Sequence, residues 1–116
     1  MEMKPKIIRS EKLKEKDYGA TKVIDVLNED GIKFSVAQVR KVGDDIKLGL
    51  DKESDVAYYV LEGKGKCVIG DKEHEIKKGD LVYLPKGTKY KNLKGLKLLA
   101  IAYPRFDRNK RIYFEK

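Results

Sequence analysis

Apolar and polar residues alternate in short runs along almost the whole chain, and each run ends at a cluster of turn-forming residues. Alternation with a period of two is typical of β-strands, whose successive side chains point to opposite faces. In the run Ile32–Val42, one face carries Ile32, Phe34, Val36, Gln38 and Arg40, and the other carries Ser35, Ala37, Val39 and Lys41. We expect further strands at Lys4–Arg9, Thr21–Leu27, Ile46–Leu50, Val56–Glu62, Lys66–Ile69, Glu73–Ile76, Leu81–Leu84, Tyr90–Leu93, Leu96–Tyr103 and Arg111–Phe114.

Glycine and proline mark the predicted turns. Gly63 and Gly65 flank Lys64 and predict a tight connection between two successive strands, because glycine accepts the positive φ values of hairpin turns. Near the N-terminus, Ser10 either caps a short helix reaching Lys16 or begins a turn. Roughly ten short strands with almost no helix predict an all-β barrel or sandwich.

Composition narrows the class of protein. The 116 residues fit one domain, 1–116, and no long uncharged apolar run predicts a transmembrane helix or a secretory signal, so we expect a soluble cytoplasmic protein. The only cysteine, Cys67, excludes an intramolecular disulfide and is expected to be a packing residue. Abundant Lys and Glu with a single glutamine, Gln38, resemble thermophilic proteins.

The formal net charge of +8 favours anionic ligands in general. No zinc-knuckle, RNP-like or helix-turn-helix pattern accompanies the charge, so a nucleic-acid partner is not favoured. Five lysines follow Pro85 and either draw an acidic ligand to one end of a barrel or form a scattered basic surface: Lys86, Lys89, Lys91, Lys94 and Lys97.

The segment YYVLEGKGKCVIGDKEHEIKKGDLVYLPKGTKYKN, which begins at Tyr58, resembles the core of a small single-domain cupin. Cupins form the RmlC-like jelly-roll, or double-stranded β-helix, superfamily. The resemblance extends from about Gly43 to Tyr103, residues 43–103, and fades toward both ends. It implies a cupin-type barrel with at most a short N-terminal helix.

The second motif of that family is a glycine, five residues, a proline, one residue, a glycine, two residues, a histidine, three residues and an asparagine. Gly79, Pro85 and Gly87 match it in identity and spacing, but Tyr90 takes the place of the histidine and Lys94 that of the asparagine. The structural part of the motif is present, and its metal-binding part is absent.

The first motif is a histidine, one residue, a histidine, three or four residues, a glutamate, six residues and a glycine. If Gly63 is its glycine, Val56 takes the glutamate position. The histidine positions are then held by Leu50 and Lys52, or with the longer spacer by Gly49 and Asp51. Metal-dependent cupins use three histidines and one glutamate, whereas the only histidine here, His74, lies outside both motifs. We therefore expect no metal and no other cofactor.

A one-residue bulge in the acidic segment would change that expectation. It would turn Asp55 inward in place of Val56 and put Asp51 and Glu53 on the same face. Three carboxylates are suited to a hard cation such as Mg²⁺ or Ca²⁺. The alternative is a solvated acidic loop.

Val56, if it points inward, shares its face with Tyr58 and Val60, and Tyr90 faces them from the second motif. With Lys52 these residues form the predicted ligand pocket, in which tyrosine hydroxyls stand above an apolar floor. The alternative is that the tyrosines only fill the core.

These observations favour a metal-independent cupin that binds a small anionic or sugar-like ligand. A sugar isomerase, epimerase or lyase is a second hypothesis, although metal-independent enzymes of the family use a histidine with no counterpart here, and we assign no catalytic residue. A structural dimerisation or nucleic-acid-associated module is a third. We expect a homodimer that pairs through the end segments Lys4–Arg9 and Arg111–Phe114.

Overall fold

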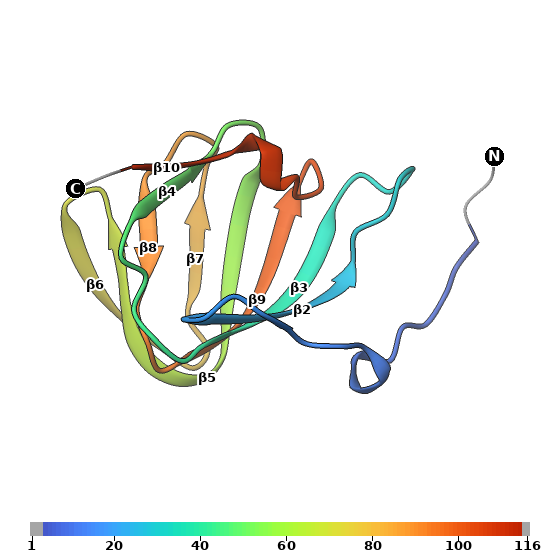
Figure 1. Cartoon of the computed structure of the whole chain (residues 1–116), viewed down its shortest axis with the longest axis horizontal. Coiled ribbons are helices and arrows are strands. Elements are labelled where there is room, and N and C mark those ends of the chain that lie inside the picture. The colour runs from blue at the N-terminus through green and yellow to red at the C-terminus, as the bar shows by residue number, and fades with distance from the viewer. Residues whose placement is uncertain (1–3, 115–116) are drawn as a thin grey trace.

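A computed structural model describes residues 4–114. Antiparallel strands curl into a barrel, and the N-terminal segment extends away from it (Figure 1). The strands are β1 (Lys16–Asp17), β2 (Thr21–Leu27), β3 (Ser35–Lys41), β4 (Leu48–Asp51), β5 (Asp55–Ile69), β6 (Lys72–Lys77), β7 (Leu81–Leu84), β8 (Tyr90–Asn92), β9 (Leu96–Tyr103) and β10 (Arg111–Phe114). Two single-turn 3₁₀ helices, Ser10–Lys12 and Arg108–Lys110, complete the described elements. The predicted all-β cupin-type barrel is confirmed.

Strand β5 connects the two halves of the barrel. Its first part pairs with β9 on one side and with β7 on the other, and its second part pairs with β8 and β6. The first half continues through β9 to β3, β2 and β1, and the second through β8 to β4 and β10. One long strand therefore belongs to both walls of the barrel.

The predicted tight turn at Gly63 and Gly65 is wrong, because β5 continues through these glycines for 15 residues. Gly63 has φ +85°, and a Cβ there would lie 2.1 Å from the carbonyl oxygen of Gly95. The glycines thus let β5 bend while the segment between β8 and β9 runs beside it in close contact.

The N-terminal predictions hold only in part. Residues 4–9 form no strand, so the edge strand predicted at Lys4–Arg9 is wrong, and the helix is reduced to one 3₁₀ turn. Arg9 rather than Ser10 is its N-cap, and Arg9 makes no side-chain capping bond. With Leu13 as the lone apolar anchor, this segment has too little apolar surface to hold a longer helix.

The core lies between the two walls of the barrel. Its fully buried side chains are Val60, Cys67, Leu84, Leu96 and Leu98, which come from β5, β7 and β9. Their burial follows from the two-residue period of strands that present one face to the interior. Among residues 4–114, no helix is long and apolar enough to cross a membrane.

Candidate functional site

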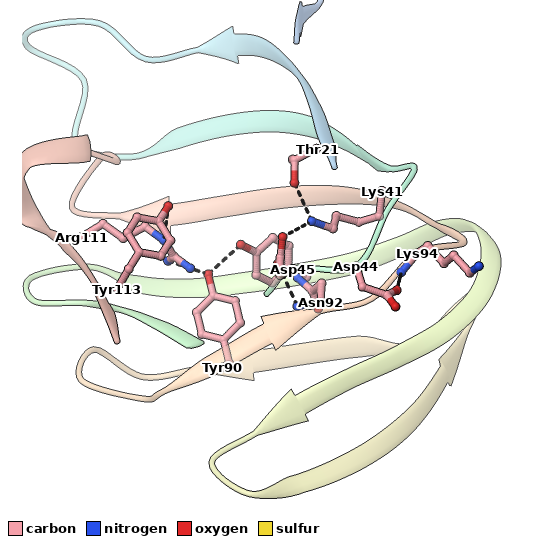
Figure 2. A network of polar contacts seen from close by, with 10 residues as sticks. Thr21, Lys41, Asp44, Asp45, Tyr90, Asn92, Lys94, Arg111 and Tyr113 are labelled. Atoms are coloured by element: carbon pink, nitrogen blue, oxygen red, sulfur yellow. Dashed lines mark hydrogen bonds and ion pairs between the residues drawn. The ribbon is translucent and has the colours of Figure 1, made fainter. Parts of the chain in front are cut away.

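Two tyrosines meet at the polar end of this interior. Tyr58 lies on the inward face of β5, Tyr90 begins β8, and their hydroxyl oxygens are 2.7 Å apart (Figure 2). Their ring centroids are separated by 5.7 Å with the rings tilted by 59°. Tyr90 is buried and Tyr58 is half-buried, and their hydroxyls bond to each other.

Arg111 of β10 continues this chain of polar groups. Its Nη1 donates a hydrogen bond of 2.9 Å to the Tyr90 hydroxyl, and its Nε donates one of 3.2 Å to the Tyr113 hydroxyl. The guanidinium carbon also lies 4.9 Å from the centroid of the Tyr90 ring, within the range of a cation–π contact. For the third guanidinium nitrogen, Nη2, the described residues provide no hydrogen-bond acceptor.

Gly49 provides the space for this guanidinium. It is buried in β4, opposite Tyr90 on one side and Tyr113 on the other. A Cβ at position 49 would lie 2.7 Å from Arg111 Nη2 and 3.1 Å from its guanidinium carbon, so even alanine would displace the group. The glycine and the arginine therefore form a matched pair.

Asp51 is the other inward residue of β4, and it is directly opposite Arg111 in the β4–β10 ladder. It is only 3% exposed. Its Oδ1 accepts a 3.3 Å hydrogen bond from the backbone amide of Ser54, but its Oδ2 is buried without a partner among the described residues. A buried acceptor left unpaired costs about 1–3 kcal/mol, so this oxygen requires an explanation.

Burial controls the ionisation of these groups. It raises the pKa of Tyr58 well above its ordinary value, and the nearby Tyr90 adds to the shift. Burial also raises the pKa of Tyr90, although the Arg111 charge opposes it, and both hydroxyls therefore keep their protons at neutral pH. For Arg111, burial opposes the charged form, but the surrounding tyrosines outweigh it and hold its pKa above the usual value.

Burial raises the pKa of the Asp51 carboxyl as well, against the lowering effects of the Ser54 hydrogen bond and the Arg111 charge. The Cys67 thiol, buried in β5, has its pKa raised by the same cause to about 11. A thiol with this pKa is almost entirely protonated at neutral pH, in agreement with its predicted role as a packing residue.

A second polar cluster ties the β3–β4 loop to the barrel. The buried Lys41 ammonium donates to Thr21 and to Asp45, and Asp45 Oδ2 accepts a 3.1 Å hydrogen bond from the amide of Asn92 (Figure 2). After burial and Tyr90, Asp45 also contributes to the raised pKa of Tyr58.

The structure brings most of the predicted pocket together. Val56 and Val60 are buried in β5 on the face that carries Tyr58, and Tyr90 meets Tyr58 as described. Lys52 is exposed and lies after β4, outside the group of inward side chains. His74 is exposed in β6, opposite Cys67, and lies apart from the tyrosine pair.

The three carboxylates proposed for a hard cation do not gather at one point. Asp51 is buried, whereas Glu53 forms a 3.5 Å ion pair with Lys110, and Asp55 accepts a 2.9 Å hydrogen bond from the amide of Lys86. No group of three or more His, Cys, Asp or Glu side chains able to hold a metal occurs within residues 4–114. The bulge hypothesis required Asp55 to point inward in place of Val56. It is wrong, because at the start of β5 the buried residue is Val56 and not Asp55.

Sequence reasoning assigned no role in the site to Arg111 or Lys41, and it named Gly49 only as one alternative for a histidine position. Arg111 was part of a predicted strand near the C-terminus, 21 positions from Tyr90, and nothing in the local pattern connects the two. The sequence contains a signal for the buried lysine, because alternation in Ile32–Val42 puts Lys41 on the same face as Ser35 and Val39. A charged residue in phase with apolar ones is a usable signal for a buried ion pair.

Comparison with known proteins agrees with this geometry. A model of the Cupin domain family matches residues 41–93. The uncharacterized protein MJ1618 of Methanocaldococcus jannaschii is 34% identical over 114 residues, which cover 88% of this chain and 90% of that protein. The chain belongs to the cupin family.

Solved structures share the fold of this cupin at low sequence identity. Pac13 from Streptomyces, a nucleoside dehydratase, superposes with a TM-score of 0.86 at 14% identity, covering 97% of this chain and 92% of Pac13. Ectoine synthase from P. lautus superposes with a TM-score of 0.77 at 18% identity, covering 96% and 91%. At such identities the likeness establishes the fold alone.

The residues at the family's metal-ligand positions do not fit a metal ion. Because Gly49 and Asp51 face inward in β4, the longer spacer of the first motif applies, and the four positions hold Gly49, Asp51, Val56 and Tyr90. Only one of these is a carboxylate, none is a histidine, and the guanidinium of Arg111 lies beside them. A fixed positive charge there would repel a second cation.

Proposed function

We propose that this cupin binds a small anionic or sugar-like ligand in its barrel without a metal ion. The observation that carries the proposal is the chain of polar groups that runs from half-buried Tyr58 through Tyr90 to Arg111. Two hydroxyls and a guanidinium offer hydrogen-bond donors at fixed positions above the apolar floor of Val56 and Val60. Such a floor with a few convergent polar groups is typical of small-molecule sites.

Arg111 is the residue that gives the site its preference for anions. Its charge persists at every accessible pH, and its Nη2, which has no acceptor among residues 4–114, is the nitrogen that we propose for an oxygen of a carboxylate or phosphate. Hydrogen bonds to charged groups contribute about 1.5–3 kcal/mol each. One such bond accounts for roughly a tenfold to hundredfold difference in affinity.

The Arg111→Met variant tests the proposal, because methionine keeps much of the side-chain volume and removes the charge. We expect titration calorimetry with D-gluconate and D-glucose 6-phosphate to show binding to the wild type and a loss of at least about tenfold in the variant. Gly49→Ala should weaken binding in the same direction, since the new methyl displaces the guanidinium.

Lys52→Met is the matched control, because Lys52 is exposed and its loss removes the same charge. Its affinity should stay within about twofold of the wild type. Native mass spectrometry of the purified protein with parallel elemental analysis checks the metal-free part independently. A stoichiometric transition metal, or equal losses in the two methionine variants, would contradict the proposal.

A metal-independent enzyme of the isomerase, epimerase or lyase kind is the second candidate. Its support is that structural neighbours include enzymes, and that solved Pac13 variants with uridine include two tyrosine-to-phenylalanine changes. In this chain the equivalent test is Tyr90→Phe, which removes the hydroxyl between Tyr58 and Arg111. Turnover of a sugar phosphate or nucleoside that Tyr90→Phe eliminates would favour the enzyme.

We further propose that the protein is a homodimer, formed through the outer surface of the β7–β5–β9 sheet. Five large side chains project there and are 38–61% exposed, namely Tyr59, Leu81, Tyr83, Ile101 and Tyr103, and we call this the outer apolar face. The register places Ala57 between Tyr83 and Ile101, and Tyr59 beside Leu81, so the side chains are contiguous. Large exposed apolar patches mark interaction surfaces.

The outer apolar face is self-complementary, which favours a second copy as its occupant. Charge at its ends is balanced, because Arg40 forms a 2.9 Å ion pair with Glu15 and Lys97 lies opposite Glu62. A two-fold axis brings the same face of two copies together. The uncharged centre lets two chains of net charge +8 approach.

A further inference from the structure

The unpartnered Oδ2 of Asp51 narrows the ligand class within the proposed function, on which this inference rests. We infer that Asp51 accepts a hydrogen bond from a ligand hydroxyl while Arg111 holds the ligand's anionic oxygen, so that the ligand is a hydroxy acid or a sugar acid. The two residues are directly opposed in the β4–β10 ladder and therefore lie on one face.

The placement of the two side chains supports this division of roles. Directly opposed residues of an antiparallel pair have Cβ atoms roughly 5 Å apart, so the side chains of Asp51 and Arg111 leave the ladder side by side. Arg111 supplies donors only, whereas an ionised Asp51 supplies acceptors only. A ligand that satisfies both must carry an anionic acceptor and a neutral donor.

The local structure fixes the position of Asp51. Its Oδ1 is fixed by the Ser54 amide, and its own backbone carbonyl accepts a 2.8 Å bond from the Gly87 amide, so the residue is held from two sides. Arg111 directs its hydrogen bonds to Tyr90 and Tyr113 instead of to the carboxylate. The Oδ2 oxygen therefore has no partner among the described residues, and Arg111 is the neighbour of Asp51 across the ladder.

Because Asp51 is buried, the binding free energy of a ligand depends strongly on whether it donates a hydrogen bond to this carboxylate. A carboxylate that is 3% exposed gains more from one hydrogen bond than a solvated one does, because little water competes for it. A site with a buried acceptor rejects analogues that lack the matching donor, since the acceptor is then left unpaired. Asp51 is thus expected to control specificity more than affinity for anions in general.

The test compares ligands that differ only in hydroxyls. Titrations followed by ¹H–¹⁵N correlation spectra, which detect millimolar affinities, would use lactate against propanoate and D-gluconate against hexanoate. The wild type should bind each hydroxylated member at least about tenfold more tightly. Asp51→Ala should bring the two members of a pair within about twofold of each other, and Glu53→Ala, an exposed neighbour in the same segment, should keep the preference.

The outcomes separate the two proposals. Equal binding of both members of each pair by the wild type would overturn the inference about Asp51 and leave anion binding by Arg111 intact. A preference that survives in both Asp51→Ala and the isosteric Asp51→Asn would also overturn it. Binding of none of the four acids by the wild type would overturn the proposed function together with this inference. The wild-type comparison needs no variant to fold.

Discussion

At the scale of single residues, the buried carboxyl of Asp51 lowers the stability of the folded protein. Its carboxyl is buried, one oxygen is unpaired, and burial raises its pKa. Natural proteins tolerate such residues where function requires them and compensate elsewhere. The neighbouring Arg111 reduces the cost without removing it.

This cost predicts a pH dependence. Because the folded-state pKa of Asp51 is raised above the unfolded value, its contribution to stability is fully present below the unfolded pKa and is lost as the pH rises through the folded pKa. Asp51→Asn is neutral throughout. From about pH 3 to pH 7 the variant should therefore gain stability relative to the wild type, by about 1.4 kcal/mol for each unit of pKa shift.

Urea unfolding followed by circular dichroism at several pH values measures this difference. Glu53→Gln serves as its control, because Glu53 is exposed. A difference between Asp51→Asn and the wild type that stays constant across the pH range would contradict the assignment of the raised pKa to Asp51.

At the scale of elements, the fold depends on how β5 bends between the two walls. The bend is possible because Gly63 adopts a positive φ and the carbonyl of Gly95 passes within 2.1 Å of where a Cβ would stand. The same bend aligns β8 and β9 along one edge of β5 and so brings Tyr90 to Tyr58. The geometry of the site is therefore a consequence of this bend.

We expect Gly63→Ala to destabilise the protein by roughly 3 kcal/mol or more, since a left-handed conformation costs about 1–2 kcal/mol and the clash with the Gly95 backbone adds to it. Gly70→Ala is the matched control, with φ +64° and no atom within 4 Å of the added Cβ. It should cost only the conformational penalty of about 1–2 kcal/mol. If urea unfolding gave equal losses of unfolding free energy for Gly63→Ala and Gly70→Ala, the close approach of the Gly95 carbonyl to Gly63 would be contradicted.

At the scale of the whole molecule, charge and apolar surface are separated. The chain carries a net charge of +8, yet the centre of the outer apolar face is uncharged. Of the end segments expected to pair copies, residues 4–9 form no strand, whereas β10 pairs with β4 and lies at an edge of the sheet (Figure 1). The outer apolar face has five exposed large side chains, against Ile112 and Tyr113 in β10, and is the better candidate for self-association.

Size-exclusion chromatography with light scattering at micromolar concentration should give twice the 13.3 kDa mass of the chain. Ile101→Lys, which puts a charge in the outer apolar face, should give a monomer, whereas Ile46→Lys, at a position 75% exposed in the β3–β4 loop, should remain a dimer. A wild-type monomer, or a dimer that tolerates Ile101→Lys, would contradict the proposed interface.

The amino-acid sequence by itself determined most of the strands and the family. Period-two alternation and the glycines and proline of the second motif are local properties, so the bounds of eight predicted strands lie within three residues of those of β2–β4 and β6–β10, and the two runs around Gly63 form β5. Tyr58, Tyr90, Val56 and Val60 were also predictable, because strand parity and motif spacing place them on one face.

Only the tertiary structure decided what stands at the centre of the site. Whether Leu50 or Gly49 faces inward depends on a one-residue choice of spacer, which the pairing of β4 with β8 and β10 fixes. The meeting of Arg111 with Gly49, Asp51 and Tyr90 joins three distant segments, and no local pattern encodes such a contact. The strand pattern specifies the barrel, and long-range packing specifies its chemistry.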